Sequence, residues 1–118
     1  MNTEKYTVSL FGMDRKQYSK DEILTVWEEC ANREYQESKI YVTVLVDVKL
    51  LLCGEKRGCD LYEEAYVITS VRNPVEGVDS TLFFEALKRV IAHFRSMLGN
   101  PCMTIGKEQI EFYYFIQR

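Results

Sequence analysis

The predicted strands of this chain carry apolar residues on both faces, whereas the sequence predicts only two helices to cover them. One face is an alternating aliphatic stripe made of Ile40, Val42, Val44, Val46, Val48, Leu50 and Leu52. Residues of the opposite parity, here and in neighbouring segments, are also large and apolar: Phe11, Tyr41, Leu45, Leu51, Tyr62, Tyr66, Ile68, Tyr113 and Phe115. Two helices cover one face of a sheet, so we expect the second set to form an interface with a partner.

Two segments have the start signals and the period of amphipathic helices. Ser19 and Glu22 have the spacing of a capping box, and apolar residues follow it at helical spacing until the polar run that begins at Asn32. A second helix is predicted from Asp79 or Ser80, and the sequence Gly99-Asn100-Pro101 ends it.

The strands are predicted from alternation and from their turn residues. They are Tyr6–Phe11, Ile40–Cys53, Asp60–Val71 and Ile110–Ile116, with a short additional strand at Met103–Ile105. The segment Ile40–Cys53 is longer than most strands, so we expect a bend or bulge near Asp47. The turn Gly54–Gly58 should join it to the next strand as an antiparallel hairpin.

The order of elements is therefore βαββαβ in a single domain that spans residues 1–118. It predicts an α+β fold, a ferredoxin-like two-layer sandwich in which a four-stranded sheet has both helices on one face. A tautomerase-like arrangement, built from a similar string of elements, is the alternative. Tautomerases use an N-terminal proline as a base, but here Asn2 follows Met1 and the first proline is Pro74.

Composition narrows the classes of function. Hydrophobic residues make up 47% of the chain and charged residues 28%, as in soluble globular proteins. The net charge of −3 argues against nucleic acid as a partner. Asp47 and Lys49 interrupt the longest apolar stretch, so no membrane association is expected, and the N-terminus lacks the pattern of a secretory signal. We expect a cytoplasmic protein.

No catalytic, metal or cofactor motif stands out. The four cysteines, Cys30, Cys53, Cys59 and Cys102, are expected to be reduced, although Cys53 and Cys59 flank a turn and could pair. Their spacing is not that of a zinc site. We therefore predict no metal, no cofactor and no assigned catalytic residue, and the single histidine, His93, is expected at the surface.

A basic rim is the predicted ligand-binding site. In the ferredoxin-like topology three loops meet at one end of the sheet, and they would bring together Arg15, Lys16, Lys56 and Arg57. Arg57 lies in a glycine-flanked turn and could form a forked contact with a phosphate or carboxylate. Acidic residues on the same loops would partly neutralise this rim.

Two functions remain open. The first is a small non-catalytic protein that self-associates as a dimer or trimer through its open sheet face and recognises a small molecule or a protein partner. The alternative is a small-molecule enzyme, an isomerase or tautomerase-like protein or another proton-transfer catalyst, with its site in a cavity between subunits. Asp47, Lys49, His93 and tyrosine hydroxyls would then supply the proton transfer.

Overall fold

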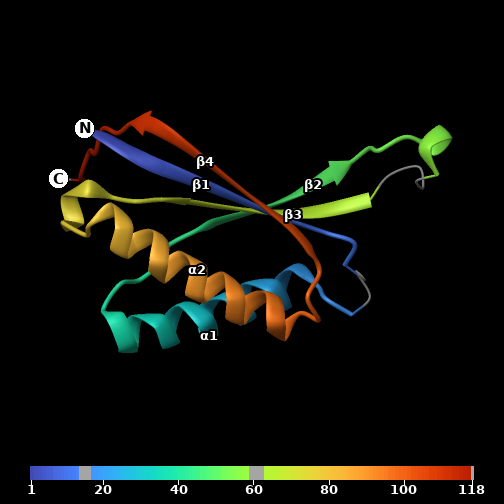
Figure 1. Cartoon of the computed structure of the whole chain (residues 1–118), viewed down its shortest axis with the longest axis horizontal. Coiled ribbons are helices and arrows are strands. Elements are labelled where there is room, and N and C mark those ends of the chain that lie inside the picture. Colours follow the sequence, from blue (N-terminus) through green and yellow to red (C-terminus); the bar gives the residue numbers. More distant parts are fainter. Residues whose placement is uncertain (14–16, 59–62, 118) are drawn as a thin grey trace.

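A computed structural model describes residues 1–13, 17–58 and 63–117. Its elements are β1 (Asn2–Phe11), α1 (Lys20–Ser38), β2 (Leu45–Leu51), the 3-10 turn η1 (Glu55–Arg57), β3 (Glu63–Val71), the 3-10 turn η2 (Pro74–Glu76), α2 (Ser80–Met97) and β4 (Cys102–Glu111). The sheet order is β2-β3-β1-β4, and all three neighbouring pairs are antiparallel. Both helices cover one face of the sheet (Figure 1). The predicted ferredoxin-like α+β fold is confirmed.

Both helices begin at the caps that the sequence predicts. The Ser19 hydroxyl accepts a hydrogen bond from the Glu22 backbone N–H, and the Asp79 carboxylate accepts from the first N–H groups of α2. Helix α1 extends to Ser38, beyond the predicted end near Asn32. A glutamate in this polar extension, Glu34, is buried by α2 and pairs with Arg89, so the polar run continues the helix instead of ending it.

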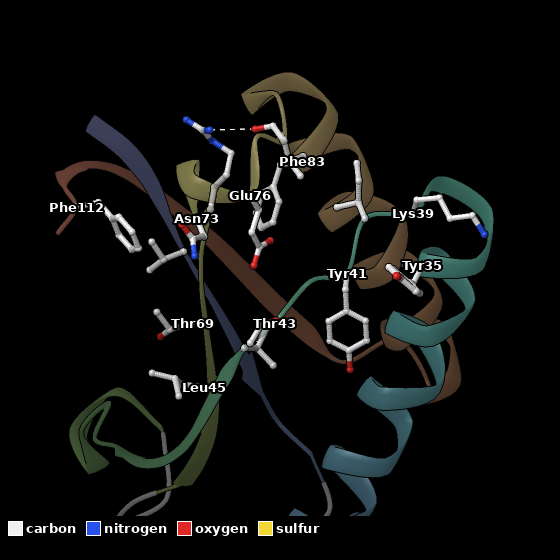
Figure 2. A pocket seen from close by; sticks show the side chains of 15 residues that line it. Tyr35, Lys39, Tyr41, Thr43, Leu45, Thr69, Asn73, Glu76, Phe83 and Phe112 are labelled. Carbon is white, nitrogen blue, oxygen red and sulfur yellow. Dashed lines mark hydrogen bonds between the residues drawn. The ribbon is translucent and has the colours of Figure 1, made fainter. Parts of the chain in front are cut away.

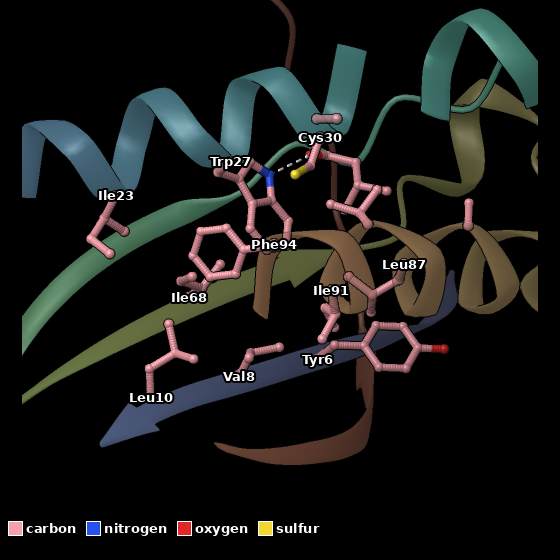
Figure 3. Close-up of a cluster of buried hydrophobic side chains, with 14 of the residues drawn as sticks. Tyr6, Val8, Leu10, Ile23, Trp27, Cys30, Ile68, Leu87, Ile91 and Phe94 are labelled. Carbon is pink, nitrogen blue, oxygen red and sulfur yellow. Dashed lines mark hydrogen bonds between the residues drawn. The ribbon is translucent and has the colours of Figure 1, made fainter. Parts of the chain in front are cut away.

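The core lies between the helices and the inward face of the two central strands. From β1, Tyr6, Val8 and Leu10 are buried against the helices. Trp27 of α1 and Phe94 of α2 meet edge to face, with their ring centroids 5.0 Å apart (Figure 3). This aromatic contact lies over the sheet where the helices cross, and it holds α1 and α2 together above one face.

The inward residues of β3 include two that were predicted to lie on the open face. Tyr66 and Ile68 are 4% and 1% exposed and belong to the core, so their predicted role in an oligomer interface is wrong. The Tyr66 hydroxyl donates to the Tyr18 carbonyl oxygen, 3.0 Å away. Their parity differs from the prediction because β3 pairs with β1 in a register that places Tyr66 opposite the buried Leu10.

Strand β2 is shorter than the predicted segment Ile40–Cys53. Its pairing with β3 is continuous from Leu45 to Leu51, without the bulge expected near Asp47. Residues 40–44 lie outside the strand, because side chains bind their backbone in place of a neighbouring strand. The Trp27 indole donates to the Val42 carbonyl oxygen at 3.3 Å, and the Ser70 hydroxyl donates to that of Thr43 at 2.9 Å.

The last strand lies earlier in the chain than predicted. Strand β4 ends at Glu111, and its pairing with β1 covers the whole of β1, so no partner strand is left for the residues that follow. Tyr113 and Phe115 therefore lie beyond the strand, where they are 69% and 89% exposed. The prediction that they belong to a sheet face is wrong.

The hairpin of β2 and β3 projects beyond the helices as an arm (Figure 1). Because the arm projects beyond the helices, the helices cover only part of the predicted aliphatic stripe. Val42 is fully buried under the helices, whereas Leu50 and Leu52 are 68% and 74% exposed on the arm.

On the open face, most of the described residues of β1 are polar, since Lys5, Thr7 and Ser9 alternate with its core residues. Phe11, Leu45 and Leu51 do share this face, by their register with neighbouring strands. The most exposed apolar side chains of the described residues are thus divided between Leu45 on this face, the arm, and the chain after β4.

Candidate functional site

A cavity of about 500 Å³ opens at the end of the sheet opposite the arm (Figure 2). Its wall comes from six parts of the chain: the end of α1, residues 39–45, the end of β3, the connection from β3 to α2, the start of α2, and the chain after β4. The lining residues are Tyr35, Lys39, Ile40, Tyr41, Thr43, Val44, Leu45, Thr69, Val71, Arg72, Asn73, Glu76, Val78, Phe83 and Phe112. Its volume is in the range of small-molecule sites.

The late start of β2 creates this space. Because β2 pairs with β3 only from Leu45, residues 40–44 diverge from the end of β3. The hydrogen bonds from Trp27 and Ser70 hold this diverging segment in place. Tyr41 and Thr43, which alternate with the buried Val42, consequently line the cavity.

Aromatic rings form much of the wall. Tyr35 and Tyr41 meet edge to face, with their centroids 6.1 Å apart, and both remain partly exposed at the mouth. Phe83 is buried at the start of α2, and Phe112 lies just after β4. The Phe112 carbonyl oxygen accepts from the N-terminal ammonium group of Met1, 3.2 Å away. Such surfaces suit a planar ring or an organic cation.

The charge directed into the cavity is negative. Figure 2 shows the Glu76 carboxylate pointing inward and the Lys39 side chain pointing away. The Lys39 ammonium donates instead to the Gln36 carbonyl oxygen at 3.2 Å. Arg72 also lines the cavity, but its guanidinium is occupied by Glu4. The cavity therefore favours a ligand that carries positive charge.

The Glu4–Arg72 pair is buried beside this wall. Two guanidinium nitrogens of Arg72 donate to the two Glu4 carboxylate oxygens, at 3.0 and 3.1 Å. The Ser80 hydroxyl donates to the same carboxylate. The hydrogen bond from Arg72 holds the pKa of Glu4 below its ordinary value of 4.5, against the opposing effect of burial. Glu4 is therefore ionised at neutral pH and fully paired.

The predicted basic rim is only partly described. Lys56 and Arg57 are exposed in η1, at the tip of the arm. Arg15 and Lys16 lie outside the described residues, so the clustering of all four remains a prediction. In Figure 1 the arm extends past the connection between α2 and β4 at this end of the sheet.

The predicted interface residues divide between several places. Tyr41 and Leu45 line the cavity, while Phe11 and Leu51 lie on the open sheet face. Tyr62 lies outside the described residues.

Asp47 and Lys49, proposed for proton transfer, are exposed on the arm. His93 lies on α2, and neither it nor these two residues lines the described cavity.

The cysteines differ from one another. Cys30 is buried and free, and Cys102 is exposed and free, as predicted. Cys53 is disulfide-bonded, which contradicts the expectation that it is reduced. Cys59 lies outside the described residues.

Glu76, Arg72 and Glu4 were not predicted from the sequence. Glu4 carried a usable signal, because it has the inward parity of Tyr6 and Val8 in the first strand. A carboxylate at such a position requires a buried cationic partner. Glu76 carried no comparable signal: it lies in a turn whose position over the cavity is set by the fold.

Comparison with models of known families shows to which family the chain belongs. A family model described as SAM lyase matches residues 1–116. The chain belongs to the SAM lyase family. Among solved structures, the apo state of a phage SAM lyase is similar, with a TM-score of 0.55 and 10% identity over 98% of this chain and 94% of that chain.

A de novo designed protein, Foldit4, has a TM-score of 0.54 at 9% identity, and the match covers 90% of this chain and 96% of that chain. No curated protein matches the sequence. At such low identity these structures support the fold alone, which a designed protein shares as closely as a natural lyase does.

Membership of the SAM lyase family bears on the two functions left open by the sequence. It favours the alternative, a small enzyme, and the non-catalytic binder is not confirmed. Among the described residues, the helices of this family member are too short or too polar to cross a membrane.

Proposed function

We propose that this chain is a lyase that cleaves a carbon–sulfur bond of S-adenosylmethionine, and that the cavity beside Glu76 binds this substrate. The observation that carries the proposal is the inward-pointing carboxylate of Glu76 among aromatic rings, in a member of the SAM lyase family.

The chemistry of the substrate fits this cavity. S-adenosylmethionine combines a planar adenine with a sulfonium and an ammonium group, and its carboxylate leaves a net positive charge. Tyr41 and Phe112 offer ring faces to the adenine or to the sulfonium. Glu76 supplies the opposite charge. The contact of Glu76 should be with a group that keeps its charge, because a carboxylate at the sulfonium would stabilise the substrate more than the transition state.

A lyase reaction can proceed here without a protein base. The carboxylate of the substrate attacks the methylene carbon bonded to sulfur, a carbon–oxygen bond forms, and the carbon–sulfur bond breaks with its electron pair on sulfur. The products are a five-membered lactone and a neutral thioether, and no proton is transferred. Holding the chain in a folded conformation supplies the proximity that such a ring closure needs. The described cavity is lined by no histidine, which agrees with a reaction of this kind.

The test is product analysis of the purified protein with S-adenosylmethionine. Mass spectrometry should find an adenosine thioether and a lactone whose masses add up to that of the substrate, with no water added. Replacing Glu76 by Gln should raise KM about tenfold, the effect of losing roughly 1.4 kcal/mol of binding. Glu28→Gln, on the exposed side of α1, is the matched control. Folded wild-type protein that does not cleave S-adenosylmethionine would refute the proposal.

We also propose that the chain forms a homodimer or homotrimer, and that the arm is the main contact. Leu50 and Leu52 are 68% and 74% exposed on the projecting hairpin. A cluster of exposed aliphatic side chains of this kind is unusual on a monomer.

Light scattering at micromolar concentration should give a mass at least twice that of the chain. Replacing Leu50 and Leu52 together by Glu should yield monomers, because burying unpaired carboxylates costs several kcal/mol, on the order of 3 or more. The control replaces two exposed helix leucines, Leu24 and Leu82, in the same way. A monomeric wild-type protein would refute self-association.

A further inference from the structure

The connection between β3 and α2 carries the only acidic group that lines the described cavity. It runs from Arg72 to Asp79 and contains the single turn η2, which presents Glu76. Asn73 caps this turn by accepting from the Val75 backbone N–H at 2.9 Å, and Gly77 ends it with a φ of 75°. These contacts are local and exposed, so they fix the shape of the turn but not its position over the cavity.

Its position is fixed by Glu4 on the neighbouring strand. At the first end of the connection, Arg72 binds the Glu4 carboxylate with two nitrogens, and the Arg72 backbone N–H donates to the Glu4 carbonyl oxygen at 3.1 Å. At the second end, the Ser80 hydroxyl donates to the same carboxylate. The remaining guanidinium nitrogen of Arg72 donates to the Val78 carbonyl oxygen at 3.1 Å. One buried carboxylate thus ties both ends together.

A second carboxylate–guanidinium pair shows what a purely structural pair looks like in this fold. Glu34 of α1 accepts two hydrogen bonds from Arg89 of α2, both at 2.9 Å. Glu34 and Glu4 are each 4% exposed. The Glu34–Arg89 pair joins two helices, however, and neither of its members lines the cavity. The two pairs have similar geometry and differ in what they hold in place.

We infer that Glu4 and Arg72 are positioning residues for the cavity: they clamp both ends of the β3–α2 connection so that Glu76 is held facing the ligand. The inference rests on the proposed function for its kinetic consequence only. Its structural consequence, a connection that is ordered by the clamp, can be measured without any substrate. Hydrogen bonds to a charged, buried partner are strong enough for such ordering, because the alternative leaves the carboxylate without a partner.

Hydrogen–deuterium exchange on the full chain tests the clamp directly. In Glu4→Gln, the backbone amides of residues 75–79 should exchange at least about tenfold faster than in the wild type, since local opening no longer breaks a charge-assisted network. Glu34→Gln is the matched control. Exchange in this segment should be the same as in the wild type, even if this variant lowers the melting temperature as much as Glu4→Gln does. Equal exchange in the two variants would overturn the inference.

Kinetics with S-adenosylmethionine supply the second measurement. Glu4→Gln should raise KM severalfold and change kcat less, and Glu34→Gln should change neither. If the wild type does not cleave S-adenosylmethionine, the proposed function fails, and the exchange result still decides the clamp. If Glu4→Gln does not fold, Ser80→Ala and Arg72→Lys are the milder variants. They keep a partner for Glu4 but loosen one end of the connection, and unchanged exchange in both would also overturn the inference.

Discussion

The two ends of the sheet hold their arginines in opposite ways. At the tip of the arm, Arg57 is exposed in a turn between two glycines. At the cavity end, Arg72 also lies beside a turn, but it is bound by a buried carboxylate and by a backbone carbonyl oxygen. For the proposed cavity site, the signal in the sequence is Glu4, a buried acid that requires a basic partner.

The largest expected difference between the two ends is in stability. Arg72→Ala leaves the Glu4 carboxylate buried without its cation, so the free energy of unfolding should fall by about 3–5 kcal/mol. Arg57→Ala removes an exposed side chain and should change it by less than about 0.5 kcal/mol. Urea denaturation of both variants measures the contrast. Similar losses of unfolding free energy in the two variants would show that Arg72 contributes no more to stability than Arg57 does.

The pH dependence of stability should sharpen the contrast. The pKa of Glu4 is lowered below 4.5 by Arg72, so its pairing stabilises the fold above that pH and is lost as the pH falls through the folded-state pKa. Arg89 lowers the pKa of Glu34 in the same direction. Each group contributes a slope of at most about 1.4 kcal/mol per pH unit in acid.

Glu4→Gln should therefore flatten the acid branch of the stability curve, with Glu34 accounting for what remains. Arg57→Ala should keep the steep branch of the wild type, because it leaves both pairs intact. Thermal denaturation at a series of pH values below about 5 measures this, the range in which carboxylates of ordinary pKa take up protons. An acid branch that is unchanged in Glu4→Gln would contradict the conclusion that the lowered pKa of Glu4 contributes to it.

The smallest expected effect is that of the arm on substrate binding. Arg57→Glu reverses a charge at the opposite end of the sheet from the cavity, where salt screens it over a distance of about 8–10 Å. KM for S-adenosylmethionine should then change by less than about twofold, the size of a weak surface interaction. An exposed helix arginine, Arg33, gives the matched charge reversal. A larger change in KM for Arg57→Glu than for the Arg33 variant would indicate that the substrate binds at the basic rim.

Local signals in the sequence determined the helices and the topology. The caps at Ser19 and Asp79 and the periods that follow them predict where the helices begin. With two helices between four apolar segments, right-handed crossovers leave few arrangements, and the ferredoxin-like one is observed. These properties depend on neighbouring residues, so one sequence is enough to predict them.

Strand ends, strand parity and the site were decided by the tertiary structure. Val42 and Leu50 belong to one alternating stripe, yet the helices cover only Val42, because the hairpin extends past them. Residues 40–44 have a strand-like sequence, but Trp27 and Ser70 bind their backbone and so open the cavity. Glu76 faces this cavity because a strand distant in sequence ties down its connection. Such outcomes depend on contacts between remote segments, which periodicity does not record.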